Sequence, residues 1–126
     1  IVYGIPAQKE GIMEDLLFKD SKKNKTFVVD KERKGVKKAR LFYNVIETFE
    51  LNGKTVSKVH IVLDTGRSHQ IRAQFAYRKM PLVGDGKYGA KDNEKNIALC
   101  STRISFSSPF SCTYFCFENN KTQTLN

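Results

Sequence analysis

Apolar and polar positions alternate along two neighbouring stretches of the chain, 38–50 and 56–63. Alternation of this kind is typical of a β-strand with one buried face. Between the two stretches stands Asn52-Gly53, a pair that favours the type I′ turn of a two-residue hairpin. The pattern therefore predicts an antiparallel β-hairpin. We expect its buried face to hold Leu41, Tyr43, Val45, Val59, Ile61 and Leu63.

Shorter apolar runs predict further strands before and after this hairpin. Residues 1–4 have the pattern of a strand end, and 12–18 has the pattern of a short strand. Near the other end, 97–106 and 113–117 are rich in β-branched and aromatic residues and flank Ser107-Ser108-Pro109. Serine and proline in such a cluster favour a turn, so these two runs predict a second antiparallel pair.

The hydrophobic period changes between residues 68 and 79, which predicts a short amphipathic helix. Ile71 and Phe75 are four residues apart, the spacing that places two side chains on one helical face. Ser68 is a residue type that caps helix starts, and Met80-Pro81 provides a stop. Docking of the apolar face would leave the polar face open to a ligand.

Strands outnumber this single helix, and no long linker divides the chain. The sequence therefore predicts one α+β domain over residues 1–126, with a mostly antiparallel or mixed sheet and few helices. No apolar run is long enough for a membrane span, and no signal-peptide pattern is present, so we expect a cytoplasmic protein. The three cysteines and two histidines predict reduced thiols and no metal site.

Charge points to an anionic partner, because the chain has a net charge of +9 and a sequence pI near 9.6. Ten basic residues lie between positions 19 and 40: Lys19, Lys22, Lys23, Lys25, Lys31, Arg33, Lys34, Lys37, Lys38 and Arg40. Two interpretations of this segment stay open. It is either a solvated, mobile loop or an arm that follows the phosphates of a nucleic acid.

Three cations gather where the predicted helix begins: Arg67, His69 and Arg72. The first turn of a helix has unpaired N–H groups and the positive end of the helix dipole, and it therefore favours anions rather than cations. Such crowding predicts an anionic partner at this point. A phosphate group or a carboxylate from elsewhere in the protein would fill that role.

One block of residues resembles a known family. The block consists of Thr65-Gly66-Arg67-Ser68-His69-Gln70-Ile71-Arg72, Pro81, Gly84-Asp85 and Tyr88-Gly89. It is similar to the motifs of ribosomal large-subunit pseudouridine synthases of the RluA type, and weaker similarity extends over residues 1–117. The resemblance implies a mixed, largely antiparallel sheet beside a central cleft. It also implies an RNA-modifying isomerase without cofactor or metal, which acts on ribosomal or transfer RNA.

The resemblance also shows what the chain does not contain. The family's catalytic aspartate lies in a His-Arg-Leu-Asp motif, which is absent from this sequence. We therefore expect that aspartate upstream, and we expect the chain to be the C-terminal portion of a catalytic domain and inactive alone. Asp64, at a variable position after a strand, and Asp85, in the Gly-Asp loop, do not match it. Tyr3 falls too late in the chain to match the family's active-site tyrosine.

Six residues are candidates for the site. By resemblance, Arg72 is the catalytic partner that pairs with the absent aspartate. Ile71 and Leu99 are expected to form an apolar surface beside the target base. Arg67, His69 and Gln70 are expected to shape the loop or contact phosphate, and no residue near His69 in the sequence would orient it as a base.

Two other functions remain open. The chain could be a basic RNA-binding module that kept this scaffold and lost the chemistry. It could also bind a small phosphorylated ligand, although it lacks a Walker-type glycine-lysine loop. An incomplete domain would expose strand edges and apolar surface, so self-association of the chain is a further expectation.

Overall fold

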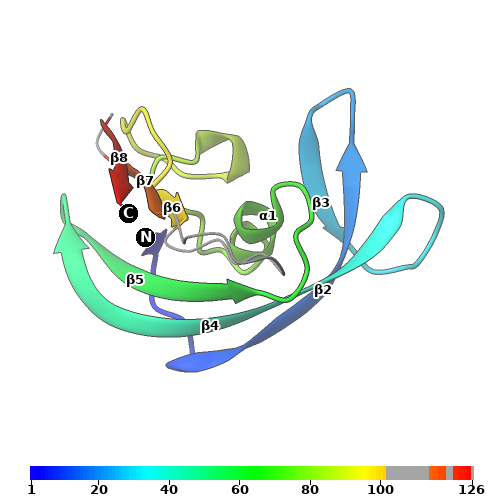
Figure 1. Ribbon diagram of the computed structural model, residues 1–126, viewed down its shortest axis with the longest axis horizontal. Coiled ribbons are helices and arrows are strands. Elements are labelled where there is room, and N and C mark those ends of the chain that lie inside the picture. Colours follow the sequence, from blue (N-terminus) through cyan, green and yellow to red (C-terminus); the bar gives the residue numbers. More distant parts are fainter. Residues whose placement is uncertain (102–113, 119–120, 126) are drawn as a thin grey trace.

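The computed structural model describes residues 1–101, together with the strand pairing of 114–118 and 121–125. Its main element is a five-stranded antiparallel sheet with the strand order β1-β5-β4-β2-β3, which curves around helix α1 (Figure 1). The strands are β1 (Val2–Tyr3), β2 (Glu10–Asp20), β3 (Lys25–Val29), β4 (Val36–Leu51) and β5 (Lys54–Leu63).

The predicted hairpin is confirmed as β4 and β5. Its turn residues Asn52 and Gly53 have φ values of 49° and 80°, the positive values that a type I′ turn requires. The sequence did not predict the irregularity in register between Val45 and Glu47. Leu63 also differs from expectation, because this last residue of β5 is 47% exposed.

The basic segment 19–40 is not a mobile loop, and that interpretation is wrong. Residues 25–29 form β3, which pairs with the end of β2, and residues from Val36 onward belong to β4. At the turn between β2 and β3, the Asp20 carboxylate accepts hydrogen bonds from the backbone N–H groups of Lys22 at 3.0 Å and Lys23 at 3.2 Å. The basic side chains are therefore presented by a folded hairpin.

Helix α1 (Gln70–Tyr77) is shorter than predicted at both ends. The residue before it, His69, has a φ of 53°, and no side chain caps the helix, so the expected capping by Ser68 is wrong. The Ser68 carbonyl instead accepts a hydrogen bond of 2.9 Å from the Thr26 hydroxyl. The helix ends before the predicted stop, and Lys79 takes a left-handed conformation with a φ of 61°.

Two groups of buried side chains attach α1 to the sheet. The first surrounds Phe75, which is fully buried as the helical pattern predicted, and contains Val2, Met13, Leu41 and Leu82. The second contains Leu17, Ala39, Ala73 and Tyr88. Phe75 and Ala73 pack in different groups, so the helix is fixed at two places on the concave face of the sheet.

A second antiparallel sheet has the order β6-β7-β8. Its strands are β6 (Leu99–Ser101), β7 (Tyr114–Glu118) and β8 (Lys121–Leu125). The predicted pairing of the runs 97–106 and 113–117 is confirmed for β6 and β7. Strand β8 was not predicted. Residues 102–113, with the expected turn at Ser107-Ser108-Pro109, lie outside the described residues.

Cys100 on β6 is disulfide-bonded, so the expectation of reduced cysteines is wrong for this residue. The odd number of cysteines favoured reduced thiols, but it does not show which residue faces Cys100 across the sheet. In the observed register, Cys100 lies directly opposite Cys116. Opposed residues of antiparallel strands have Cα atoms about 4.5–5.5 Å apart, a spacing that disulfides require.

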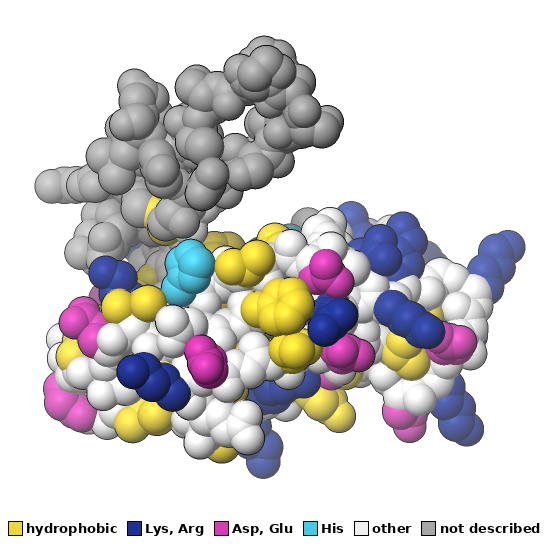
Figure 2. Space-filling view, turned by 60° about the horizontal axis from the view of Figure 1, so that its bottom comes forward, with side chains coloured by type: hydrophobic (Ala, Val, Ile, Leu, Met, Phe, Trp, Pro, Cys, Tyr) yellow, Lys and Arg dark blue, Asp and Glu magenta, His cyan; other side chains and the backbone are white. Residues whose placement is uncertain are grey.

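The outer face of the main sheet carries an exposed apolar row. Ile12, Phe42 and Val62 are neighbours across β2, β4 and β5, and they are 50%, 37% and 51% exposed. Figure 2 shows apolar side chains gathered over the middle of this face. An uncovered row of this kind supports the expected self-association, which stays a prediction. No helix in the described part of the chain is long and apolar enough to cross a membrane.

Candidate active site

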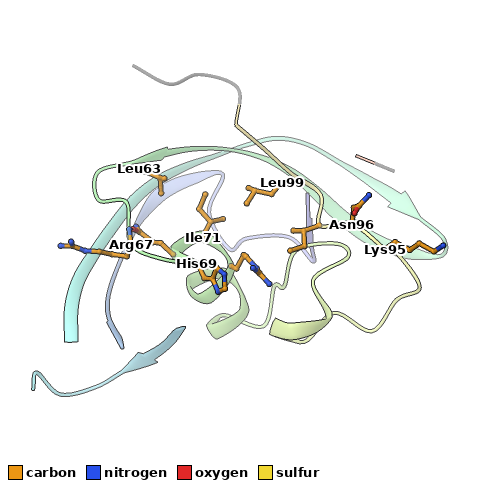
Figure 3. Close-up of a pocket in the computed structure, with 10 residues that line it drawn as sticks. Leu63, Arg67, His69, Ile71, Lys95, Asn96 and Leu99 are labelled. Carbon is orange, nitrogen blue, oxygen red and sulfur yellow. The ribbon is translucent and has the colours of Figure 1, made fainter. Parts of the chain in front are cut away.

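A cavity of about 550 Å³ lies where the end of β5, the start of α1 and the segment 95–99 meet (Figure 3). Its lining consists of Leu63, Arg67, His69, Gln70, Ile71, Arg72, Lys95, Asn96, Ile97 and Leu99. All six residues that the sequence analysis proposed therefore lie around one cavity, although Leu99 is 27 positions after Arg72 in the chain. Their roles stay predictions.

The side chain of Gln70 shapes the loop that leads into the helix. This side chain is buried, with 2% exposure. Its Oε1 accepts hydrogen bonds from the Thr65 hydroxyl at 2.8 Å and the Arg67 backbone N–H at 3.0 Å. Its Nε2 donates to the Arg40 carbonyl at 3.1 Å. Gln70 therefore links the loop to β4 and fixes the backbone from which Arg67 extends.

Replacing Gln70 with alanine is expected to lower the free energy of unfolding by about 1–2 kcal/mol, because the buried groups lose their hydrogen-bond partner. Urea denaturation measures this loss. The matched control is Gln8→Ala, since Gln8 is exposed and should change stability by less than about 0.5 kcal/mol. Equal losses in the two variants would show that Gln70 does not organise the loop.

Arg72 forms a two-pronged ion pair with Asp85. Its Nε donates to Asp85 Oδ2 and its Nη2 donates to Oδ1, both at 2.9 Å. The side chains are 16% and 1% exposed. The hydrogen bonds from Arg72 to Asp85 hold the pKa of the arginine above its usual value. Among the described residues, no hydrogen bond involves Arg72 Nη1, and Arg72 is part of the cavity lining.

His69 has an orienting partner that lies 19 positions away in the sequence. Its Nδ1 lies 2.8 Å from the Tyr88 hydroxyl oxygen, which also accepts a 2.8 Å hydrogen bond from the Thr26 backbone N–H. The pKa of His69 is lowered, first by burial and then by Arg72, Lys87 and Lys19. No local sequence signal could reveal Tyr88 as the partner, because the two residues meet only after the chain has turned back.

The opposite side of the cavity is apolar. Figure 3 shows Leu63, Ile71 and Leu99 on this side, with Arg67 and Lys95 at opposite ends. Sequence reasoning missed Lys95 and Asn96, because their place at the cavity depends on how the segment 95–99 packs in space. Apolar side chains next to cations are suited to a flat, partly polar ligand with a negatively charged attachment.

No carboxylate lines the cavity in the part of the chain that the structure describes. Asp85 is buried behind Arg72, and the Asp64 side chain is 53% exposed beside Arg40 at 4.0 Å. The described residues also contain no group of three or more acidic, cysteine or histidine side chains placed to hold a metal ion. The described lining of the cavity therefore offers cations, a histidine and apolar surface, but no nucleophilic oxygen from an acid.

Comparison with known proteins decides the family. A family model described as RNA pseudouridylate synthase matches residues 1–77. The chain belongs to this family. The expected fold class also agrees with a solved structure, human RNA pseudouridylate synthase domain containing 1. That structure aligns with a TM-score of 0.63 at 18% identity and covers 98% of this chain and 50% of the human one.

Curated relatives of this pseudouridylate synthase chain confirm the resemblance to the large-subunit enzymes. It is 35% identical over 100 residues to ribosomal large subunit pseudouridine synthase D of Buchnera aphidicola, covering 79% of this chain and 29% of the relative. It is 29% identical over 120 residues to the uncharacterized RNA pseudouridine synthase YlyB of Bacillus subtilis, covering 94% and 37%. The chain thus spans well under half the length of these relatives.

Proposed function

We propose that this chain is the C-terminal portion of the catalytic domain of an enzyme that converts uridine in RNA to pseudouridine. In that reaction the C1′–N1 bond of the nucleotide breaks and a C1′–C5 bond forms. The hydrogen on C5 leaves as a proton, and N1 gains a proton. The observation that carries the proposal is that five of the eight residues of the motif 65–72 line one cavity with an apolar side; they are Arg67, His69, Gln70, Ile71 and Arg72.

Arg72 is the residue that would hold the catalytic carboxylate. Asp85 fixes the orientation of its guanidinium through Nε and Nη2, which leaves Nη1 for a second acid. A cation within a few ångström keeps a carboxylate ionised by lowering its pKa. Because the described lining has no carboxylate of its own, we propose that the aspartate comes from a segment that precedes Ile1 in the complete enzyme.

The apolar side of the cavity suits a uracil ring. Ile71 and Leu99 would pack against the ring and exclude water from the reacting atoms. A uridine must leave the stacked helix to reach such a site, as in other enzymes that modify bases. The volume of about 550 Å³ lies within the range of small-ligand sites.

Charge and the names of the relatives favour ribosomal RNA as the substrate. The net charge of +9 favours a polyanion, and the relative from Buchnera aphidicola is a ribosomal large subunit synthase. With a ribosomal substrate, we propose the cytoplasm as the compartment in which the enzyme acts. No cofactor is required, because the isomerisation transfers a base within one nucleotide and consumes no oxidant or reductant.

Reconstitution tests this function. The chain is mixed with a separately produced N-terminal segment that contains the aspartate motif, and RNA labelled with tritium at C5 of uridine is added. We expect tritium release from the mixture and none from either part alone. The matched control is the same N-terminal segment with the aspartate replaced by asparagine, which should associate with the chain and release no tritium.

Association of the two parts without tritium release would contradict the proposed reaction. In that case the alternative gains support, namely a basic RNA-binding module without catalysis. The observation in its favour is the same lack of a carboxylate in the described cavity lining. Tritium release by the chain alone would instead assign the chemistry to Asp85 or Asp64.

A further inference from the structure

The hydrogen bonds around His69 determine which ring nitrogen faces outward. Tyr88 has one hydroxyl proton, and its oxygen already accepts the N–H of Thr26 at 2.8 Å. The same hydroxyl lies 2.8 Å from His69 Nδ1, so this contact occupies Nδ1 whichever of the two groups donates, and it leaves Nε2 as the ring nitrogen for a ligand. His69 belongs to the cavity lining, and among the described residues no hydrogen bond involves its Nε2, which donates a proton to a ligand when the ring is charged.

Three lysines from three different elements surround this histidine and Tyr88. Lys19 on β2 and Lys87 in the 3-10 helix η1 (Gly86–Tyr88) both act on His69 electrostatically. Lys25 on β3 lies with its Nζ 5.3 Å from the centre of the Tyr88 ring, and the Arg72 Cζ lies 4.7 Å from the same centre. We refer to Lys19, Lys25 and Lys87 as the lysine cluster.

The lysine cluster has an acid beside it, since Asp20 on β2 is the register partner of Lys25 on β3, but it has no salt bridge in the part of the chain that the structure describes. None of the three lysines forms a salt bridge there, whereas Lys38, Arg40, Arg72 and Arg78 each do. Asp85 is the only acid that raises the pKa of His69, and both of its oxygens are bound to Arg72. Among the described residues, three lysines without a salt bridge therefore lie close to His69 and Tyr88.

We propose that the lysine cluster and His69 Nε2–H form a subsite for a phosphodiester group of RNA, next to the cavity that receives the uridine. This inference rests on the proposed function and identifies part of its substrate contact. Lysine is a compact charge with rotatable donors, which suits a phosphate whose exact position varies with sequence. Figure 2 shows further basic side chains at the end of the molecule that holds β3, along which the RNA backbone would continue.

Binding of single-stranded RNA tests the subsite without any catalytic step. Nuclear magnetic resonance follows the ring signals of His69 as a function of pH, with and without a uridine hexanucleotide. A phosphate beside the ring favours the charged imidazole, so we expect the pKa of His69 to rise when the RNA binds. The signals of His60, an exposed residue on β5, should not change and provide an internal control.

Two double variants show whether RNA binding depends on the lysine cluster or only on the net charge of the chain. Lys25→Gln/Lys87→Gln should weaken RNA binding roughly tenfold and reduce the slope of log affinity against log salt by about 1.4, as expected for two lost contacts with a single strand. Lys9→Gln/Lys58→Gln removes the same charge from exposed positions elsewhere and should change affinity less than about twofold. Inorganic phosphate is added in a separate titration to compare a free anion with the RNA backbone.

Several results would overturn the subsite. Equal weakening by the two double variants would show that only net charge matters, and RNA binding without a change at His69 would place the phosphate elsewhere. A similar response to inorganic phosphate at the same concentration would show a general anion site. Failure of tritium release in the reconstitution, with the His69 response intact, would contradict the proposed reaction and leave the subsite standing.

Discussion

Arg72→Ala is expected to lower the free energy of unfolding by roughly 3–5 kcal/mol, because it leaves the Asp85 carboxylate buried without its partner. Asp85 is 1% exposed, and among the described side chains Arg72 alone donates to it. Urea denaturation measures the loss. In the reconstituted enzyme we also expect turnover to be abolished, while RNA binding, measured where the variant is folded, stays nearly unchanged.

A double-mutant cycle separates the ion pair from the stacking of Arg72 on Tyr88. Once Asp85 has been replaced by alanine, Arg72→Ala should cost much less than it does in the original chain. Equal costs in the two backgrounds would show that the pair does not stabilise the fold.

Arg72→Lys keeps the charge but loses the planar fork, so partial activity is expected. A parallel loss of RNA binding and turnover would identify Arg72 as a phosphate contact.

Gly84→Ala is expected to destabilise the protein by about 3 kcal/mol or more, through a clash added to backbone strain. Gly84 has a φ of +84°, and a Cβ at this position would lie 1.9 Å from the Asn96 carbonyl oxygen and 2.7 Å from its carbon. Both neighbours are backbone atoms, so no side chain can move aside. The segment 95–99 must shift, and it forms one side of the cavity.

Gly89→Ala is the matched control for Gly84→Ala. Gly89 also has a positive φ, +112°, but no atom lies within 4 Å of the position of an added Cβ. Gly89→Ala should therefore lower the free energy of unfolding through backbone strain alone, by about 1–2 kcal/mol. Urea denaturation of both variants gives the comparison. If Gly84→Ala were as stable as Gly89→Ala, the backbone at Asn96 would be able to move away from the added Cβ without a loss of stability.

Local patterns predicted the elements whose signals lie within a few residues. The hairpin of β4 and β5 was predicted because alternation and Asn52-Gly53 agree with each other. Strand β3 was not predicted, because its run of β-branched and aromatic residues, 26–29, lies inside a basic segment that was interpreted by its charge alone. The start of α1 was misplaced because the buried Gln70 side chain, rather than a cap at Ser68, organises the preceding loop.

The candidate site was also predicted only where the signal lies within a few residues. The motif 65–72 identified the residues on α1 and its loop, and the resemblance added Leu99. The partners that set their chemistry, Asp85 for Arg72 and Tyr88 for His69, were not predicted as partners. Both come from a loop that follows the helix, and no periodicity relates them to it. Contacts of this kind form only through tertiary packing, so no pattern of neighbouring residues in the sequence indicates them.

The hydrogen bonds that hold His69 at the cavity join parts of the chain that are distant in sequence. The bond between Thr26 and Tyr88 spans 62 positions, and the bond between His69 and Tyr88 spans 19. Contacts of such separation require large loops to close, which disfavours their early formation during folding. A truncated chain that stops before Tyr88 would therefore still contain the whole motif 65–72 and yet have no oriented histidine.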